Sequence, residues 1–317
     1  MEHIGGVAAP FKPSLPARAL RFVRHRLRKP YKRIRGATPL VRLLNRRSRA
    51  LFNEHEAALT LLGQRILDDL NRDGISITDV QALFPSSTYL KDLQVYAEKL
   101  LHRSSPGRKK TFLKYLWGEN IEKLDLDNPF NHLAIEPLVL EIINSYMGLF
   151  AHFFFSSGNV TVPGTRDAAA AGSQRWHRDP GSGDKRIVKI FLYINDVPPE
   201  AGPFEYVRKS STTGAFAGIF PFVQPDGVYP ESGAVDAHPL LREHILSNVG
   251  KAGTMIFCDT TGLHRGGFST GKERIMATAA YTSPGSIQGF RFKLTPETKA
   301  GLQDLPSVSK YALGIER

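Results

Sequence analysis

The chain has 317 residues and a mass of 35.2 kDa, a length that suits one large domain or two small ones. Hydrophobic residues make up 41% of it and charged residues 23%, so a sizeable core can form and extensive disorder is excluded. The single cysteine, Cys258, excludes a disulfide framework and a cysteine-based zinc site. No apolar run approaches the roughly 20 residues of a membrane-spanning helix, so we expect no integral membrane protein.

The formal net charge of +12 comes from one end of the chain. Residues 1–53 contain fourteen Lys or Arg and one acid, Glu2, whereas the other 264 residues contain 28 bases and 29 acids. A protein that binds nucleic acid would continue its basic surface across the body, and this body is nearly neutral. We therefore define residues 1–53 as a basic arm, expect residues 54–317 to form a single domain, and expect no nucleic-acid partner.

The basic arm consists of two Arg-rich segments, one after Pro16 and one after Pro39, each with apolar residues at helical spacing. Four interpretations are open. The arm is a solvated helix that packs on the body, a contact to an anionic membrane surface, a contact to an acidic carrier protein, or an organelle transit peptide. Because its charges follow rather than precede any apolar run, we expect no secretory signal and a cytoplasmic (intracellular) protein, with organelle targeting left open.

Residues 54–148 show a helical pattern. Apolar residues recur at helical spacing, Asp73-Gly74 ends the first run, and a short alternating segment follows. The segment Thr78-Asp79-Val80-Gln81 has the pattern of a capping box that opens the next helix. A last helix is expected from Pro137, at the first helical position, to a C-cap at Gly148.

From residue 149 onward, short β-prone runs alternate with Gly, Pro, Asp and Ser. Strands are expected at residues 153–155, 187–194, 255–257 and 275–281. Helices first and strands later indicate an α+β fold. We expect the strands, at about residues 149–285, to close into a double-sheet jelly roll (a cupin-like double-stranded β-helix) flanked by the N-terminal helices.

The segment Trp176-His177-Arg178-Asp179 places an imidazole and a carboxylate two residues apart on an expected strand. Period-two alternation sends His177 and Asp179 to one face of that strand. The two side chains can occupy adjacent corners of a metal octahedron, and a second histidine would complete a triad that suits Fe(II). This is the only His-x-Asp in the chain. Such a pair alone is weak evidence, because chance supplies roughly 0.5 per chain of this length.

His264 and Arg274, which lie much further along the chain, strengthen the metal hypothesis. His264 lies just past the expected strand 255–257, where metal ligands usually lie, and Arg274 opens the next expected strand. An arginine that faces a mostly apolar barrel is costly unless a carboxylate meets it. A dicarboxylate cosubstrate would supply that carboxylate in bidentate geometry, and a salt bridge to an Asp or Glu of the chain is the alternative.

Four elements follow one another in an order that resembles the phytanoyl-CoA dioxygenase family of Fe(II)- and 2-oxoglutarate-dependent oxygenases. They are Gln174-Arg-Trp-His177-Arg-Asp179, residues 189–197 (KIFLYINDV), residues 202–207 (GPFEYV) with Ser210, and His264-Arg-Gly-Gly with Arg274. The resemblance covers about residues 130–285 and the segment 73–77. It implies that His177, Asp179 and His264 are the ligands of iron and that Arg274 holds the distal carboxylate of 2-oxoglutarate.

The function implied by the resemblance is a hydroxylase that uses 2-oxoglutarate and O2, acts on a small-molecule substrate and releases succinate and CO2. Desaturation and ring formation use the same triad and stay open. Two alternatives are a catalytically silent jelly-roll binding protein and an oxygenase whose substrate is an acyl-thioester or is bound to a carrier.

Three further expectations concern the surroundings of the triad. By alternation, Gln174 falls on the face opposite the ligands. Lys189 can face the barrel or turn its ammonium group toward solvent, and we expect the second orientation. Asn159 and Thr161 are candidates to line the pocket. Residues 164–172 and 210–251 are expected to form loops beside the active site.

Overall fold

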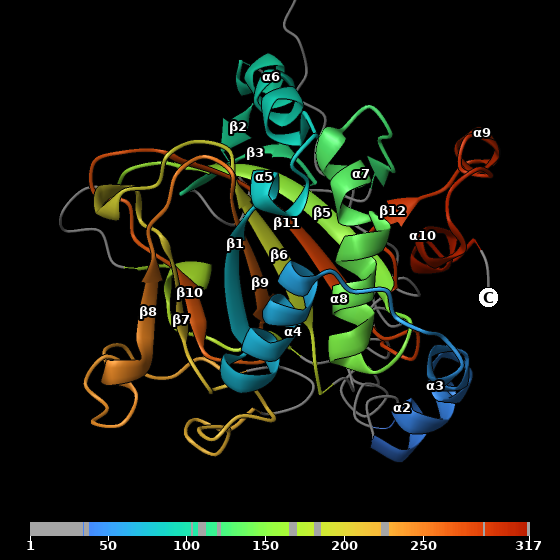
Figure 1. Ribbon diagram of the computed structural model, residues 1–317. Helices are drawn as coiled ribbons and strands as arrows, with labels where there is room; N and C mark the ends of the chain where they lie inside the picture. Colours follow the sequence, from blue (N-terminus) through green and yellow to red (C-terminus); the bar gives the residue numbers. More distant parts are fainter. Residues whose placement is uncertain are drawn as a thin grey trace, which may run out of the picture.

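The computed structural model in Figure 1 describes residue 34 and residues 38–102, 104–106, 112–118, 122–164, 170–180, 185–222, 228–287 and 289–315. The helix expected between Pro16 and Pro30 lies outside these residues. Within the described parts of the chain, no helix is long and apolar enough to cross a membrane.

Most helices precede the jelly-roll strands, and two short ones end the chain. The helices are α2 (Thr38–Leu44), α3 (Arg46–Asn53), α4 (Leu61–Asp73), α5 (Val80–Leu83), α6 (Tyr89–Leu101), α7 (Pro129–Ala134), α8 (Pro137–Met147), α9 (Pro296–Ala300) and α10 (Ser307–Ala312), with single 3-10 turns η1 (Gly172–Gln174), η2 (Pro199–Ala201) and η3 (Arg242–His244).

The strands run from β1 to β12. They are β1 (Ile75–Asp79), β2 (Ser105–Pro106), β3 (Leu113–Trp117), β4 (Glu122–Lys123), β5 (His152–Thr161), β6 (Val188–Tyr193), β7 (Phe204–Val207), β8 (Ile245–Asn248), β9 (Thr254–Asp259), β10 (His264–Gly266), β11 (Arg274–Thr282) and β12 (Phe292–Lys293).

The helix ends follow local chemistry. Gly74 ends α4 and Gly148 ends α8, both at positive φ (78° and 65°), where glycine carries no Cβ penalty. The expected capping box at residues 78–81 is wrong. Asp79 is the N-cap of α5, and its Oδ1 accepts a hydrogen bond from the Gln81 amide at 2.8 Å, while Thr78 stays in β1. Aspartate caps as well as threonine does, so the box pattern placed the cap one residue early.

Two antiparallel sheets form the jelly roll (Figure 1). The large sheet has the order β1-β9-β6-β11-β5-β3-β2 and the small sheet the order β10-β7-β8, while β12 and β4 form a separate parallel pair. The predicted α+β jelly-roll fold is therefore confirmed. Strand β1 confirms the short alternating segment expected after Gly74, whereas β2 and β3 come from a part of the chain in which we expected helices.

Apolar side chains cover both faces of the large sheet. Along β6, Val188, Ile190 and Leu192 join the core beneath the helices, whereas Phe191 and Tyr193 join the core between the two sheets. Helices α4 and α8 contact each other over the first of these cores. The molecule thus has three layers, and the middle strands are buried on both sides.

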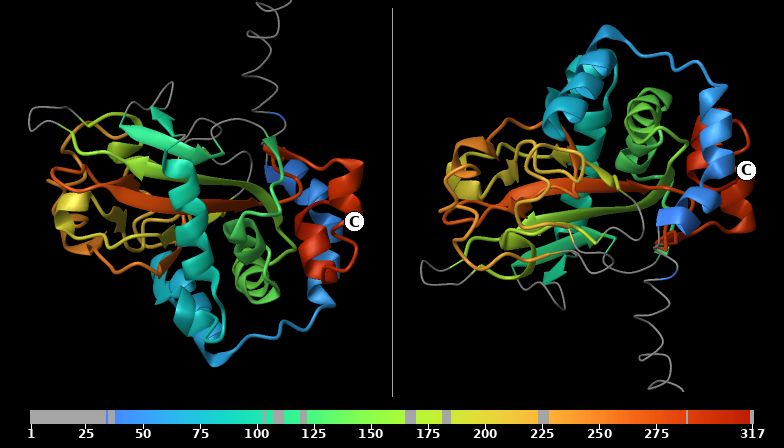
Figure 2. Two further views of the ribbon diagram at one scale, coloured as in Figure 1. Left: turned by 90° about the horizontal axis from the view of Figure 1, so that it is seen from above. Right: turned by 90° about the horizontal axis from the view of Figure 1, so that it is seen from below.

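The helices α2 and α3, which belong to the basic arm, pack on the body. Asn45, between them, is 2% exposed, donates from Nδ2 to Ser283 Oγ at 2.7 Å and accepts from the Gly285 amide at 2.6 Å. Ser48 Oγ donates to the Phe150 carbonyl oxygen at 2.8 Å. Figure 2 shows both helices at the same end of the molecule as α9 and α10, away from the small sheet. The arm boundary at residue 53 and the role of the arm stay predictions.

Candidate metal centre

His177 and His264 lie opposite each other on adjacent backbone segments. Each amide donates to the carbonyl oxygen of the other residue at 3.0 Å, and the Asp179 amide donates to Thr260 O at 2.9 Å. His264 begins β10, while His177 and Arg178 form isolated antiparallel bridges in place of the expected strand, and Asp179 lies just beyond them. The ligand atoms of His177 and Asp179 still lie on the same side, within reach of one metal ion.

The ligand atoms of His177, Asp179 and His264 all lie within 4.8 Å of one another. His177 Nε2 is 3.9 Å from Asp179 Oδ1, and His264 Nε2 is 3.7 Å from Asp179 Oδ2. The other ring nitrogen of each histidine faces a backbone carbonyl, at 2.8 Å for His177 Nδ1 to Arg175 O and 2.9 Å for His264 Nδ1 to Gly262 O. These bonds place the proton on Nδ1 and leave the Nε2 lone pairs for a metal.

The charges of the group suit a divalent cation. Burial by itself would raise the pKa of Asp179, but the Lys189 ammonium and the two histidines hold it well below its usual range. Burial, with His177 alongside, lowers the pKa of His264 to about 3. An ionised carboxylate and a neutral imidazole are the protonation states in which these side chains bind metals. Among the residues that the structure describes, no other group of three His, Cys, Asp or Glu has this geometry.

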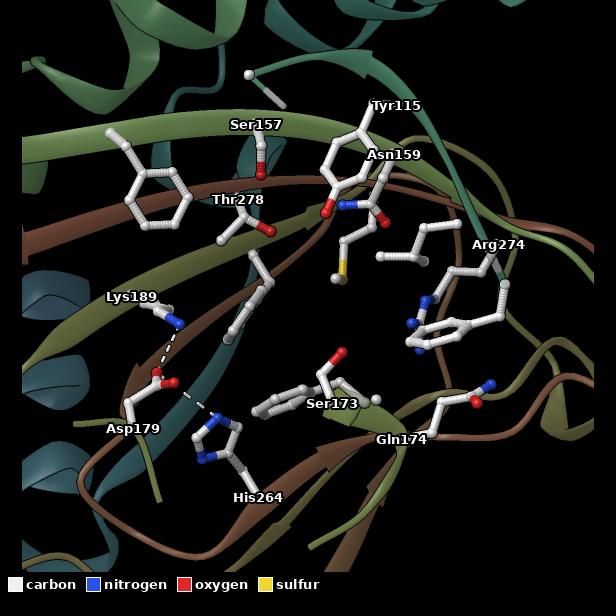
Figure 3. Close-up of a pocket in the computed structure, with 18 of the residues that line it drawn as sticks. Tyr115, Ser157, Asn159, Ser173, Gln174, Asp179, Lys189, His264, Arg274 and Thr278 are labelled. Atoms are coloured by element: carbon white, nitrogen blue, oxygen red, sulfur yellow. Dashed lines mark ion pairs between the residues drawn. The ribbon is translucent and has the colours of Figure 1, made fainter. Parts of the chain in front are cut away.

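Lys189 points into the barrel, and the expectation that it faces solvent is wrong. Its Nζ lies 2.5 Å from Asp179 Oδ2, and its side chain is 18% exposed (Figure 3). Residues on both faces of β6 are apolar, so alternation alone could not tell which face looks into the barrel. Lys189 is thus a cation beside the candidate metal ligands.

Arg274 lies across the same cavity from Asp179 (Figure 3). It is 3% exposed, and its Nη2 donates to Thr161 Oγ1 at 3.0 Å while its Nη1 donates to Gly202 O. In the described parts of the chain, no carboxylate lies within salt-bridge distance of Arg274, and its Nε has no hydrogen-bond partner. Burial lowers the pKa of Arg274, and Tyr193 opposes this shift only in part. The alternative of an internal salt bridge is therefore not observed.

Glycine at position 266 makes room for this guanidinium. A Cβ there would lie 3.3 Å from Arg274 Nη2, closer than most carbon contacts allow. The His264-Arg-Gly-Gly sequence thus supplies a candidate ligand at His264 and, at Gly266, the space that the Arg274 guanidinium occupies.

The cavity joins the two ends of the site and is lined from both sheets. Gln174 belongs to the lining and is 5% exposed, which contradicts the expectation that it faces away. It sits in the 3-10 turn η1, where strand alternation does not apply. The lining also includes Phe112, Leu113, Tyr115, Phe155, Ser157, Asn159, Ser173, Phe191, Phe204, Met276, Thr278 and Arg291.

Arg178, between the first two candidate ligands, was missed by the sequence analysis. It is 1% exposed and donates to Ser210 O, Thr261 O at 2.7 Å, Ile219 O at 3.0 Å and Phe220 O at 2.8 Å. It therefore ties the loop after β7 to the turn that precedes His264. No local sequence signal reveals this role, because all four acceptors are backbone groups distant in the chain.

Asp259 holds the same turn from the other side. It is fully buried and accepts hydrogen bonds from Tyr146 Oη at 2.7 Å, from Thr261 Oγ1 at 2.7 Å and from the Thr261 amide at 3.0 Å. Burial raises its pKa, and these donors oppose the rise. The chain that carries His264 is thus fixed by buried hydrogen bonds on both sides.

The long expected loop, residues 210–251, borders the site in its described part. From the long loop, Tyr229 stacks on the His177 ring with centroids 5.3 Å apart and an interplanar angle of 11°. Residues 165–169 of the first loop and 223–227 of the second lie outside the described residues.

Comparison with family models and with curated proteins finds no match. Among solved structures, the epimerase SnoN in complex with Fe3+, alpha ketoglutarate and nogalamycin RO is 18% identical over 78% of this chain and 91% of its own, with a TM-score of 0.52. EctD from S. alaskensis with 2-oxoglutarate and 5-hydroxyectoine is 18% identical over 72% of this chain and 78% of its own, with a TM-score of 0.50. The chain shares their fold. At this identity the likeness extends to the fold alone.

Proposed function

We propose that the protein is a non-haem Fe(II)- and 2-oxoglutarate-dependent dioxygenase that hydroxylates a small-molecule metabolite and releases succinate and CO2. The observation that carries this proposal is a single cavity that holds both the His177–Asp179–His264 group and the Arg274 guanidinium without a carboxylate partner. Two proteins of the same fold were solved with 2-oxoglutarate bound, which supports it. We also propose that the protein belongs to the phytanoyl-CoA dioxygenase family.

The donor set of the triad fits iron. Two imidazole nitrogens and one carboxylate on one side of a metal leave three positions open, and this set favours Fe(II). Iron would be held by Nε2 of His177, Nε2 of His264 and a carboxylate oxygen of Asp179. When bound, it supplies the activation of O2 that is coupled to the oxidative decarboxylation of 2-oxoglutarate. The Nδ1 hydrogen bonds to Arg175 and Gly262 orient the two rings for this task.

Two cations of the cavity, Arg274 and Lys189, fit a dicarboxylate. Arg274 offers donors at the end remote from the triad, and a planar guanidinium can hold a carboxylate through two hydrogen bonds. Lys189 supplies a second positive charge beside Asp179. A cosubstrate with an anionic group at each end would thus meet a cation at each end.

The rest of the lining is suited to a substrate with both polar and apolar parts. Ser157, Thr278 and Tyr115 offer hydroxyl groups on the side above Lys189, as Figure 3 shows, and Phe155 adds an aromatic face. We propose that the substrate enters here, between this polar wall and the triad.

The test is succinate formation across a metabolite panel with Fe(II), 2-oxoglutarate and ascorbate, with thioesters and carrier-bound compounds included. Iron content after anaerobic purification is measured in parallel. Stoichiometric iron with substrate-dependent succinate supports the proposal. A protein that binds neither iron nor 2-oxoglutarate would be the catalytically silent binding protein, and succinate formed only with carrier-bound compounds would move the substrate to that class.

We also propose that the basic arm contacts an anionic membrane surface or an acidic carrier protein. Fourteen bases and one acid in residues 1–53 support it, because such a density of like charge is stabilised by a nearby anionic partner. Co-sedimentation with anionic vesicles and pull-down with acidic carrier proteins, each at low and high salt, test the two partners. If the protein binds neither the vesicles nor the carrier proteins at low salt, the proposed contact of the arm is wrong.

A further inference from the structure

A cleft at the end of the molecule opposite the small sheet is strongly basic. It has a volume of about 800 Å³ and lies between α2, α3 and the C-terminal end of α8. Of the fifteen described residues that line it, five are cationic and none is acidic; the cations are Arg42, Arg46, Arg49, Lys185 and Arg186. Asn45, Thr38, Thr213 and Ser283 add polar groups.

Part of this positive charge has a structural explanation. Arg49 Nη1 donates to Gly148 O at 3.4 Å, and Arg186 Nη1 donates to Tyr146 O, so both arginines satisfy carbonyl groups in the last turn of α8. Cations at a helix C-terminus also interact well with its dipole. Arg186 lies over the Tyr146 ring as well, at 4.3 Å from its centroid.

The other three cations lack such an explanation. Arg42, Arg46 and Lys185 are exposed, and among the described residues no carboxylate lies within salt-bridge distance of any of them. Residues 1–37, which precede α2 in the sequence, contain ten bases and one acid. Five cations around one concave surface repel one another unless an anion lies between them.

We propose that this cleft, formed by α2, α3 and the end of α8, binds a phosphate-bearing anion. Several arginine forks that converge on one concavity match the oxygen geometry of phosphate groups, and the hydroxyl groups of Thr38 and Thr213 supply further donors. The phosphate comes either from a free phosphorylated molecule or from a lipid headgroup. A lipid headgroup fits because Leu43, the neighbour of Arg42 on α2, is 56% exposed and could contact the apolar part of a membrane.

The experiment uses the full chain with two probes. Free tripolyphosphate is titrated by calorimetry, and vesicles of phosphatidylcholine with or without phosphatidic acid are used in co-sedimentation. The test variant is Arg42→Gln/Arg46→Gln. The control is Arg208→Gln/Arg242→Gln, which removes the same charge from exposed positions next to the small sheet. All four side chains are exposed, so thermal melting should be unchanged.

We expect binding of one of the two probes to weaken at least tenfold in Arg42→Gln/Arg46→Gln and to stay unchanged in the control. Binding of tripolyphosphate identifies a free phosphorylated ligand, and binding only of vesicles that contain phosphatidic acid identifies a lipid headgroup. Equal weakening in both variants would show that net charge alone is sensed, and it would overturn the proposal. Absence of binding to either probe would overturn it as well.

Discussion

Lys189 changes the electrostatics of the candidate metal centre. The ammonium group lies against Asp179, where a divalent cation would share the same carboxylate. It therefore acts in opposite directions on two ligands: it repels a metal ion and attracts an anionic cosubstrate. The site is then best suited to a metal and a dicarboxylate together, because the anion restores the charge balance that the metal disturbs.

Replacement Lys189→Met should separate these effects. Metal affinity should rise about tenfold because a competing cation is removed, while affinity for 2-oxoglutarate should fall by a similar factor. Anaerobic calorimetry with Fe(II), and then with 2-oxoglutarate on the metal-loaded protein, measures both. Lys251→Met removes an exposed lysine of the pair with Asp196 and serves as the control. Two affinities that move in the same direction would contradict this role of Lys189.

Replacement Asp179→Ala should lower iron affinity on the order of 100-fold or more, since it removes the anionic ligand and leaves the Lys189 charge unopposed. Anaerobic Fe(II) titration measures the loss, and circular dichroism shows that the fold is retained. Asp196→Ala removes an exposed carboxylate and should bind iron as the unchanged protein does. Retained iron binding in Asp179→Ala would place the metal elsewhere.

Replacement Arg274→Ala should weaken 2-oxoglutarate binding by about 2–5 kcal/mol, because the distal carboxylate would be buried without a partner. Iron binding should persist, since Arg274 lies across the cavity from the ligands. Calorimetry on the metal-loaded protein checks both statements, with the exposed Arg72→Ala as control. An unchanged affinity for 2-oxoglutarate would shift the anchor to Lys189.

At the level of elements, β5 shows what could and could not be predicted from the sequence. Only residues 153–155 were predicted, but β5 continues to Thr161 through Ser157 and Asn159. These polar residues face the cavity, where function replaces apolar packing, so the strand loses its hydrophobic signal. The apolar strands β6 and β11 were predicted at nearly their full length and the middle of β9 was predicted as well, because both faces of these strands are buried.

The candidate site follows the same division. The spacing of His177 and Asp179 and the positions of His264 and Arg274 could be singled out in the sequence, and the structure brings all four to one cavity. Their assignment as iron ligands and cosubstrate anchor stays a prediction. Lys189 and Gln174 were misplaced because a strand buried on both sides and a 3-10 turn give no usable alternation.

Helices α2 and α3 give a prediction at the same scale. Asn45→Ala should destabilise the protein by about 2 kcal/mol, because it removes two buried hydrogen bonds, one with the Ser283 hydroxyl and one with the Gly285 amide. Urea unfolding followed by circular dichroism measures the change. Asn53→Ala, at the exposed end of α3, is the control. Equal stability of Asn45→Ala and the unchanged protein would show that this part of the arm does not contribute to the fold.

At the level of the whole molecule, the C-terminal segment closes one end of the layered body. His152, at the start of β5, stacks on Phe290 with ring centroids 4.9 Å apart, and Tyr311 lies at 5.8 Å. Phe150 contacts both Tyr311 and Phe52, so α3 and α10 meet through it. The two ends of the described chain thus share one aromatic cluster.

This cluster should make stability depend on pH. Burial lowers the pKa of His152 from its ordinary 6.5 to about 4, so between these values the unfolded chain binds a proton that the folded chain does not. Stability should therefore fall as the pH drops from about 6.5 to 4, by at most about 3 kcal/mol, and this residue should contribute no pH dependence above that window. Urea unfolding of the protein and of His152→Leu, compared at several pH values, checks this. Parallel curves would contradict it.

The single cysteine of the chain gives the molecule an internal reporter. Cys258 is fully buried on β9, paired with Ile75 of β1 and Lys189 of β6, and burial raises the pKa of its thiol well above its usual range. A thiol reagent can reach it only after the structure around it has opened, for instance when β1, an edge strand, separates from β9. The rate of labelling therefore counts openings of the sheet next to Lys189. This labelling rate would measure how much a bound metal or anion slows the local opening of the sheet, without any assay of turnover.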